Sequence, residues 1–100
     1  MNEDKQGIDI CIENKVEYPK SYKVLMLNDD YTTQDFVVEI LEEIFHKDRA
    51  EATTLMFSIH NEGRAAIGIY SYDIAVSKVK KTTTLARKAG FPLRCLIEEV

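Results

Sequence analysis

The chain has 100 residues, of which 45% are hydrophobic and 30% charged, and its formal net charge is −4. This length accommodates one compact domain with a hydrophobic core of its own. The acidic balance argues against a nucleic-acid partner, which would favour a basic surface. No apolar run reaches the roughly 18 residues of a membrane-spanning helix, and the first twenty residues lack the apolar stretch of a signal peptide. We therefore expect a cytoplasmic protein that binds neither nucleic acid nor membrane.

Residues 1–21 are mostly polar, and we expect them to form a flexible N-terminal extension. Ile8, Ile10 and Ile12 alternate with polar or small residues, as in a short strand. No adjacent segment can pair with them through a tight turn, so a mobile tail is the favoured interpretation. The folded domain is expected over residues 22–100.

Residues 22–27 read Tyr-Lys-Val-Leu-Met-Leu, which is typical of a buried strand, and the turn-forming residues 28–30 end it. Thr32 and Asp35 stand three residues apart and resemble a capping box at the start of a helix. Apolar residues then recur with helical spacing and predict one wide stripe. The stripe consists of Phe36, Val37, Ile40, Leu41, Ile44 and Phe45.

A second helix is predicted directly afterwards. His46 and Lys47 suit the C-terminus of the first helix, while Asp48 and Glu51 have the spacing of a new N-cap. Gly63 provides the left-handed residue that commonly ends a helix. The apolar stripe of this helix carries Ala52, Leu55, Met56, Ile59 and His60.

Residues 65–70 predict a second strand, and Ser71 is placed to cap a third helix. Gly90 and Pro92 end that helix, and the alternation after Pro92 predicts a closing strand. The stripe of the third helix consists of Ala75, Val76, Val79, Thr83 and Ala86. The order βααβαβ predicts an α+β fold: a two-layer sandwich with a three-stranded antiparallel sheet and three helices.

The sequence lacks the known catalytic constellations, so we expect no enzymatic activity and no cofactor. Gly63 and Gly68 have the spacing of a phosphate-binding loop, but Ile69 stands where its lysine must be. No serine lies in a Gly-x-Ser-x-Gly elbow. An enzyme would need Asp29, Asp30 and His60 as a metal site. Ordinary turn chemistry after a strand explains the two aspartates better, so we expect no metal.

A polar cluster beside apolar side chains is the most informative feature. Asn28 and Asp29 follow the first strand, and His60 lies on the stripe of the second helix with Met56. If the first two helices pack as a hairpin, Val37 faces that stripe. An apolar pocket would then adjoin an amide, a carboxylate and an imidazole. Such a site suits a ligand that carries an ammonium group next to an apolar side chain, such as the N-terminal residue of a protein.

The run from Tyr22 to Thr32, YKVLMLNDDYT, closely resembles the ClpS family of adaptors for the ATP-dependent Clp proteases. The segment 52–56 with the downstream His60 and Gly63 resembles the same family, and so does Pro92-Leu93. The resemblance covers the chain from Tyr22 to its C-terminus. It implies an adaptor that binds substrates beginning with Leu, Phe, Tyr or Trp and hands them to a AAA+ Clp unfoldase.

The resemblance also implies a role for individual residues. The ligand's α-amino group would be received by Asn28, Asp29 and His60. The rim and the following backbone would be held by Asp30 and Thr32. The side-chain pocket would be lined by Gln34, Val37, Met56, Ile59 and Leu93. The unfoldase would contact Tyr31, Asp73 and Lys78.

Two points stay open at this stage. The family commonly has Met where this chain has Gln34, which leaves the ranking of first residues undetermined. The expected fold also resembles the C-terminal domain of the bacterial ribosomal stalk protein, which implies an alternative function as a translation-factor docking module. The cluster of Asn28, Asp29 and His60 argues against that alternative.

Overall fold

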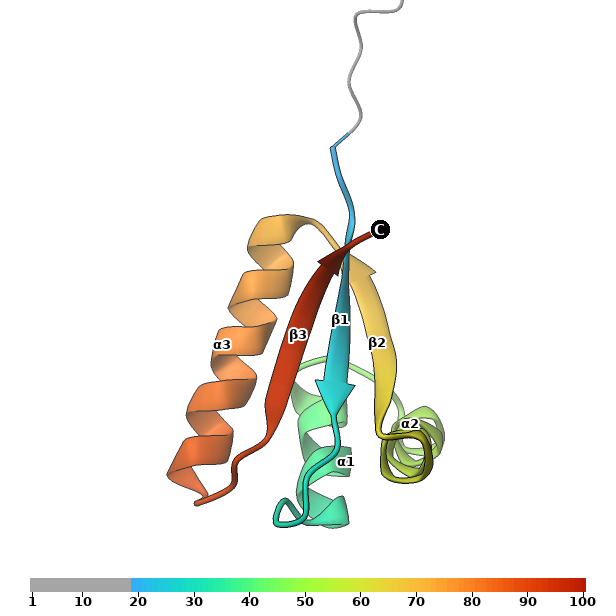
Figure 1. Cartoon of the computed structure of the whole chain (residues 1–100), viewed down its shortest axis with the longest axis vertical. Coiled ribbons are helices and arrows are strands. Elements are labelled where there is room, and N and C mark those ends of the chain that lie inside the picture. Colours follow the sequence, from blue (N-terminus) through green and yellow to red (C-terminus); the bar gives the residue numbers. More distant parts are fainter. Residues whose placement is uncertain (1–18) are drawn as a thin grey trace, which may run out of the picture.

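A computed structural model describes residues 19–100 of the chain and has the predicted α+β architecture (Figure 1). The elements in chain order are β1 (Tyr22–Leu27), α1 (Gln34–Glu43), α2 (Arg49–Glu62), β2 (Arg64–Tyr70), α3 (Tyr72–Lys88) and β3 (Arg94–Glu99). The predicted order βααβαβ is therefore confirmed. The predicted extension lies outside the described residues except for positions 19–21, which are exposed and precede β1.

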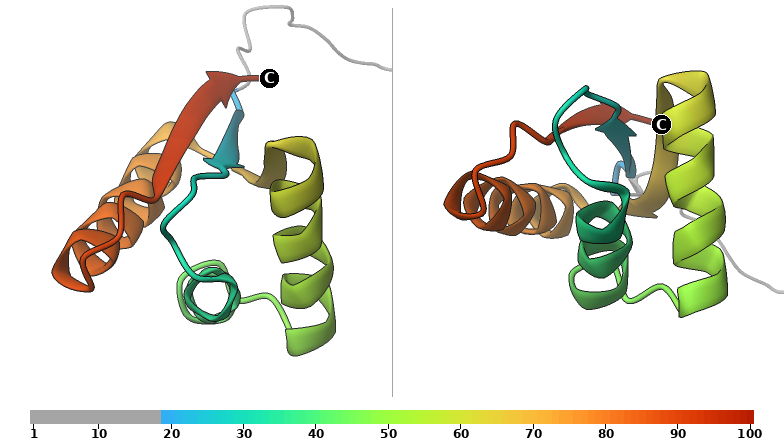
Figure 2. Two further views of the ribbon diagram at one scale, coloured as in Figure 1. Left: turned by 60° about the horizontal axis from the view of Figure 1, so that its bottom comes forward. Right: turned by 90° about the horizontal axis from the view of Figure 1, so that it is seen from below.

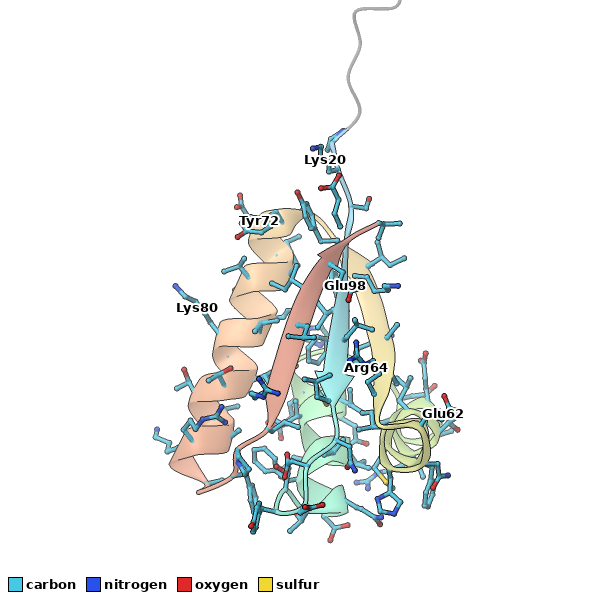
Figure 3. All side chains as sticks on the ribbon, viewed as in Figure 1. Lys20, Glu62, Arg64, Tyr72, Lys80 and Glu98 are labelled. Atoms are coloured by element: carbon cyan, nitrogen blue, oxygen red, sulfur yellow. The ribbon has the colours of Figure 1, made fainter. Side chains whose placement is uncertain are left out.

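The sheet has the strand order β2-β1-β3, with both pairings antiparallel. The central strand β1 is deeply buried on the face that carries Val24 and Met26, which are both 0% exposed. All three helices lie on one face of the sheet, as the two turned views show (Figure 2). Within residues 19–100 no helix covers the opposite face, from which side chains such as Arg64 and Glu98 project (Figure 3). The core therefore lies between one sheet face and three helices.

The start of α1 differs from the predicted capping box. The N-cap is Thr33, whose hydroxyl oxygen accepts a hydrogen bond of 3.2 Å from the backbone N–H of Phe36. The hydroxyl of Thr32 instead donates to the carboxylate of Asp29 at 2.7 Å. The prediction of Thr32 as the cap was wrong by one residue, because a neighbouring acceptor competes for its side chain. Asp35 does lie in the first turn, where a negative charge is favourable.

The boundaries of α2 agree with the prediction. The carboxylate of its N-cap Asp48 accepts a hydrogen bond of 2.8 Å from the N–H of Glu51, and Gly63 ends the helix at φ 89°. The end of α1 was predicted too late: the helix stops at Glu43, before His46, which has a left-handed φ of 57°. Ile44 and Phe45 follow the helix but are still buried in the core.

The stripe of α3 was predicted correctly at Ala75 and Ala86, which are both fully buried. Between them the buried residue is Thr82, which is 0% exposed, and Thr83 is only half-buried. The hydroxyl of Thr82 has no hydrogen-bond partner among the described residues. A polar group buried without a partner destabilises a folded protein.

We expect Thr82→Val to raise the free energy of unfolding by about 1 kcal/mol, since it removes an unpaired hydroxyl and keeps the side-chain shape. Helix propensity changes little because Thr and Val are similar. Chemical denaturation of the two proteins measures the difference, with Thr83→Val as the matched control on the half-buried neighbour. A Thr82→Val protein that is less stable than the parent would show that the hydroxyl finds a partner in solution.

Candidate functional site

An open pocket of about 580 Å³ lies at the end of the sheet where β1 runs into α1. The β1–α1 loop forms one side, the first turn of α1 another, and the C-terminal half of α2 the third. The lining residues are Asn28, Asp29, Asp30, Tyr31, Thr32, Thr33, Gln34, Asp35, Val37, Met56, Ile59 and His60. Two segments some thirty residues apart in the sequence, the loop with α1 and the end of α2, thus meet at one cavity.

A backbone hydrogen bond brings these two segments together. The N–H of Asn28 donates to the carbonyl oxygen of Gly63 at 2.9 Å, directly beyond the paired residues Leu27 and Arg64. Gly63 is the C-cap of α2, so this bond anchors the start of the loop beside the last turn of that helix. His60 lies in this last turn and is exposed at the pocket. The antiparallel pairing of β1 with β2 therefore positions Asn28 and His60 on the same cavity.

The carboxylate of Asp29 organises the loop. Its Oδ1 atom accepts hydrogen bonds from the N–H groups of Tyr31 at 2.8 Å and of Thr32 at 2.7 Å. Its Oδ2 atom accepts a third from the hydroxyl of Thr32 at 2.7 Å. An ionised carboxylate offers about four acceptor directions. One direction, on Oδ2, is therefore left for a ligand after the loop has been held in place.

These contacts also determine the charge of Asp29. Burial by itself raises the pKa of this carboxyl, but the amide and hydroxyl of Thr32, the amide of Tyr31 and the charge of Arg87 together hold the pKa below its ordinary value. Because the folded-state pKa is depressed, the ionised group stabilises the fold above the unfolded-state pKa. That contribution is lost as the pH falls through the lower folded-state pKa. At neutral pH the pocket therefore contains a negative charge at Asp29.

The apolar side of the pocket comes from residues that also belong to the core. Val37 is 6%, Met56 7% and Ile59 2% exposed, and the two helices that carry them pack against each other. The predicted hairpin packing of the first two helices thus brings all three to one cavity. Gln34 is exposed at the first position of α1 and lies at the same pocket. A side chain entering here would meet apolar groups at depth and an amide near the surface.

Leu93 is the one proposed pocket residue that the structure does not bring to the lining. Its side chain is 1% exposed and belongs to the hydrophobic core. Conversely, Thr33 and Asp35 line the pocket although the sequence analysis assigned them no ligand contact. Their position between assigned residues was the available signal, since residues 28–35 line the pocket as one continuous run.

The three residues assigned to unfoldase contact do not form one cluster. Tyr31 is 75% exposed at the pocket, whereas Asp73 lies in the first turn of α3 at the opposite end of the domain (Figure 1). Lys78 is half-buried, and its ammonium group donates to the carbonyl oxygen of Ile44 at 2.7 Å.

The same ammonium group of Lys78 lies 5.7 Å from the ring centre of Phe45 and 5.4 Å from that of Tyr70. Desolvation, and secondly the charge of Lys81, lower the pKa of Lys78. Cation–π contacts of this kind add to the hydrogen bond with the backbone. Lys78 thus links α3 to the segment after α1, which the sequence analysis did not anticipate.

Within residues 19–100, no group of three or more His, Cys, Asp or Glu side chains is arranged to hold a metal ion. The metal-site alternative built on Asp29, Asp30 and His60 therefore has no support in the geometry. None of the helices in this range has the length and apolar character required to cross a membrane.

The fold and the pocket together define a small α+β binding module with a carboxylate, an amide and an imidazole beside an apolar wall. A family model described as "ATP-dependent Clp protease adaptor protein ClpS" matches residues 17–96. The chain belongs to this family, as its resemblance over residues 22–100 predicted. The family consists of adaptors, so the expectation that the protein is not an enzyme is confirmed.

Individual relatives agree with this assignment. The chain is 56% identical over 91 residues to the ATP-dependent Clp protease adapter protein ClpS of Nautilia profundicola, which covers 89% of this chain and 94% of the relative. It is 53% identical over 87 residues to the ClpS of Ralstonia nicotianae, covering 87% and 81%. A solved structure of Agrobacterium tumefaciens ClpS2 bound to L-phenylalaninamide is similar with a TM-score of 0.80 and 38% identity, covering 83% of this chain and all of that one.

Proposed function

We propose that this protein binds the free N-terminus of substrate proteins whose first residue is Leu, Phe, Tyr or Trp, and delivers them to a AAA+ Clp unfoldase. The observation that carries this proposal is the pocket itself. Asn28, Asp29 and His60 provide acceptors for an ammonium group, and an apolar wall lies in the same cavity. The ligand in the Agrobacterium structure, L-phenylalaninamide, combines a free α-amino group with a large apolar side chain and so supports the same ligand class.

The two halves of the pocket suit the two halves of such a ligand. An α-amino group has a pKa of about 7.7–8.0, so it is mostly protonated at neutral pH. Its hydrogen bonds to a carboxylate are charge-assisted and stronger than neutral ones. Burying a Leu or Phe side chain adds roughly 1.5–3 kcal/mol. Because neither half gives high affinity alone, the pocket selects ligands that carry both groups.

Titration with peptides that differ only in their first residue tests this function. Peptides beginning with Leu, Phe, Tyr or Trp are expected to bind at least about tenfold more tightly than peptides beginning with Gly or Glu, since about 1.4 kcal/mol corresponds to tenfold. Fluorescence anisotropy or calorimetry gives the Kd values. Equal affinity for all first residues would refute the proposed function.

We propose further that delivery takes place in the cytoplasm and that the unfoldase contacts Tyr31 beside the pocket and, at separate places, Asp73 and Lys78 on α3. The family's description as a Clp protease adaptor supports the partner class. The ammonium group of Lys78 also holds α3 in place, because it donates to the carbonyl oxygen of Ile44.

His60→Ala is expected to weaken the binding of a Leu-headed peptide while leaving the fold intact. The side chain is exposed in the last turn of α2, so its removal costs little packing. Loss of a hydrogen bond to a charged group costs about 1.5–3 kcal/mol, which is roughly 10- to 150-fold in Kd. Asn61→Ala is the matched control, since this neighbour is exposed and does not line the pocket. Unchanged affinity in His60→Ala would remove this residue from the ligand set.

Gln34→Met is expected to tighten Leu-headed peptides by about 0.5–1.5 kcal/mol, the scale of one or two buried methylene groups. The amide of Gln34 lies at the pocket and either stays hydrated or loses a partner when a ligand side chain arrives. Tyr-headed peptides should gain less, because their polar tip tolerates nearby water. Titration of both peptides against both proteins at one salt concentration gives the ratio of the affinities for the Leu-headed and the Tyr-headed peptide. A Leu-to-Tyr ratio that does not change would show that Gln34 does not bound the side-chain site.

A further inference from the structure

Arg87, in the last turn of α3, makes contacts that the sequence analysis did not assign to any function. Its Nη1 atom donates to the carbonyl oxygen of Phe91 at 2.9 Å and to that of Leu93 at 2.8 Å. Both acceptors belong to the connection between α3 and β3. Backbone bonds hold the start of the same connection, from Phe91 N–H to the carbonyl of Ala86 at 2.8 Å and from Gly90 N–H to that of Arg87 at 3.0 Å. The guanidinium therefore ties the far half of the connection to the helix.

This connection supports the pocket through α1. The ring of Phe91 packs against the ring of Phe36, with centroids 5.0 Å apart and an interplanar angle of 57°. Phe36 lies in the first turn of α1, and its neighbours Gln34 and Val37 in that turn line the pocket. If the connection between α3 and β3 became mobile, the first turn of α1 would lose the packing of Phe91 that holds this wall of the pocket in place.

Arg87 also acts on the polar end of the pocket. It forms no ion pair with Asp29 among the described residues, but its charge contributes, after the bonds from Thr32 and Tyr31, to the lowered pKa of that carboxyl. The other groups that could influence Asp29 are those that line the same pocket, among them Asp30, Asp35 and His60. One side chain outside the lining thus influences both the apolar wall and the charged acceptor.

We propose that Arg87 is a positioning residue for the peptide site: its hydrogen bonds to the carbonyl oxygens of Phe91 and Leu93 hold the connection whose Phe91 ring packs against the first turn of α1. This inference rests on the proposed function. Its physical basis is preorganisation, since a binding wall held by packed neighbours loses less conformational freedom when the ligand arrives.

The test compares Arg87→Gln with Lys88→Gln in the full chain. The control removes the same charge from the adjacent exposed residue in the same turn, which makes no carbonyl contact of this kind. Arg87→Gln is expected to lower the affinity for a Leu-headed peptide roughly tenfold, because a binding wall that has lost its supporting contacts is no longer held in the geometry that the ligand needs. In an NMR titration of Arg87→Gln, the midpoint of the Asp29 carboxyl should move to higher pH than in the parent, because the positive charge is gone. Lys88→Gln should change neither quantity, and unfolding curves show whether each protein is folded.

Phe91→Leu provides a second variant that keeps the charge of Arg87. Phe91→Leu should lower the affinity for the peptide while the titration midpoint of the Asp29 carboxyl stays unchanged. The double variant should bind the peptide no more weakly than Arg87→Gln does, because both substitutions act on the same turn of α1. Binding by the parent protein tests the proposed function separately. If the parent binds a Leu-headed peptide and both single variants fold and bind it as tightly as the parent does, the positioning role is refuted. If Arg87→Gln does not fold, the affinity of Phe91→Leu decides.

Discussion

A peptide that begins with Leu or Phe is expected to lose at least about a hundredfold in affinity, or roughly 2.7 kcal/mol, when its N-terminus is acetylated. Acetylation removes the positive charge that the ionised Asp29 attracts, and it removes donors for which Asn28 and His60 would be the acceptors. Acceptors that stay desolvated without a donor add to the loss. The acetyl group also needs space at the polar end of the pocket, where the loop is held by three hydrogen bonds to Asp29.

The measurement is a competition titration with one peptide in its free and acetylated forms. The pH dependence provides a second check, because the free peptide should bind more weakly as the pH rises through the pKa of its amine, about 7.7–8.0. The acetylated form should show no such change. Equal affinities of the two forms would mean that the polar end of the pocket does not recognise an ammonium group.

Asp29→Ala is expected to have the next largest effect, a loss of about a hundredfold or more for a Leu-headed peptide. The substitution removes the negative charge and also the acceptors of three hydrogen bonds that hold the loop. A bond to a charged group contributes about 1.5–3 kcal/mol, and disorder of the loop adds to that loss. Asp29→Asn should fall between parent and alanine variant, since an amide oxygen replaces part of the acceptor capacity without the charge.

The depressed pKa of Asp29 predicts how affinity depends on acid. Because the pKa of this carboxyl lies below its ordinary value, Asp29 stays ionised and should not limit affinity for a Leu-headed peptide between pH 7 and pH 5. Asp30→Ala is the charge-matched comparison for Asp29→Ala, because this rim residue lines the same pocket but accepts none of the three loop hydrogen bonds. If both alanine variants weaken binding equally, general negative charge explains recognition better than the geometry of Asp29.

The sequence by itself determined the element order, most boundaries and the family. Helices and strands have different hydrophobic periods, and caps such as Asp48 and Gly63 act within a few residues, so both can be predicted from neighbouring residues. The polar motif after β1 and His60 also pointed to one cavity. They meet because α1 packs on α2 and because Asn28 bonds to Gly63.

Only the tertiary structure decided which partner each polar group takes. Thr32 lost the capping position to Thr33 because Asp29 competes for its hydroxyl. Lys78 donates to the carbonyl oxygen of Ile44, 34 residues away, although the family resemblance implied only a contact with the unfoldase. Leu93 is a core residue, and Arg87 holds its carbonyl oxygen. Such pairings depend on distances between elements that pack together, and those distances have no signature in the spacing of residues along the chain.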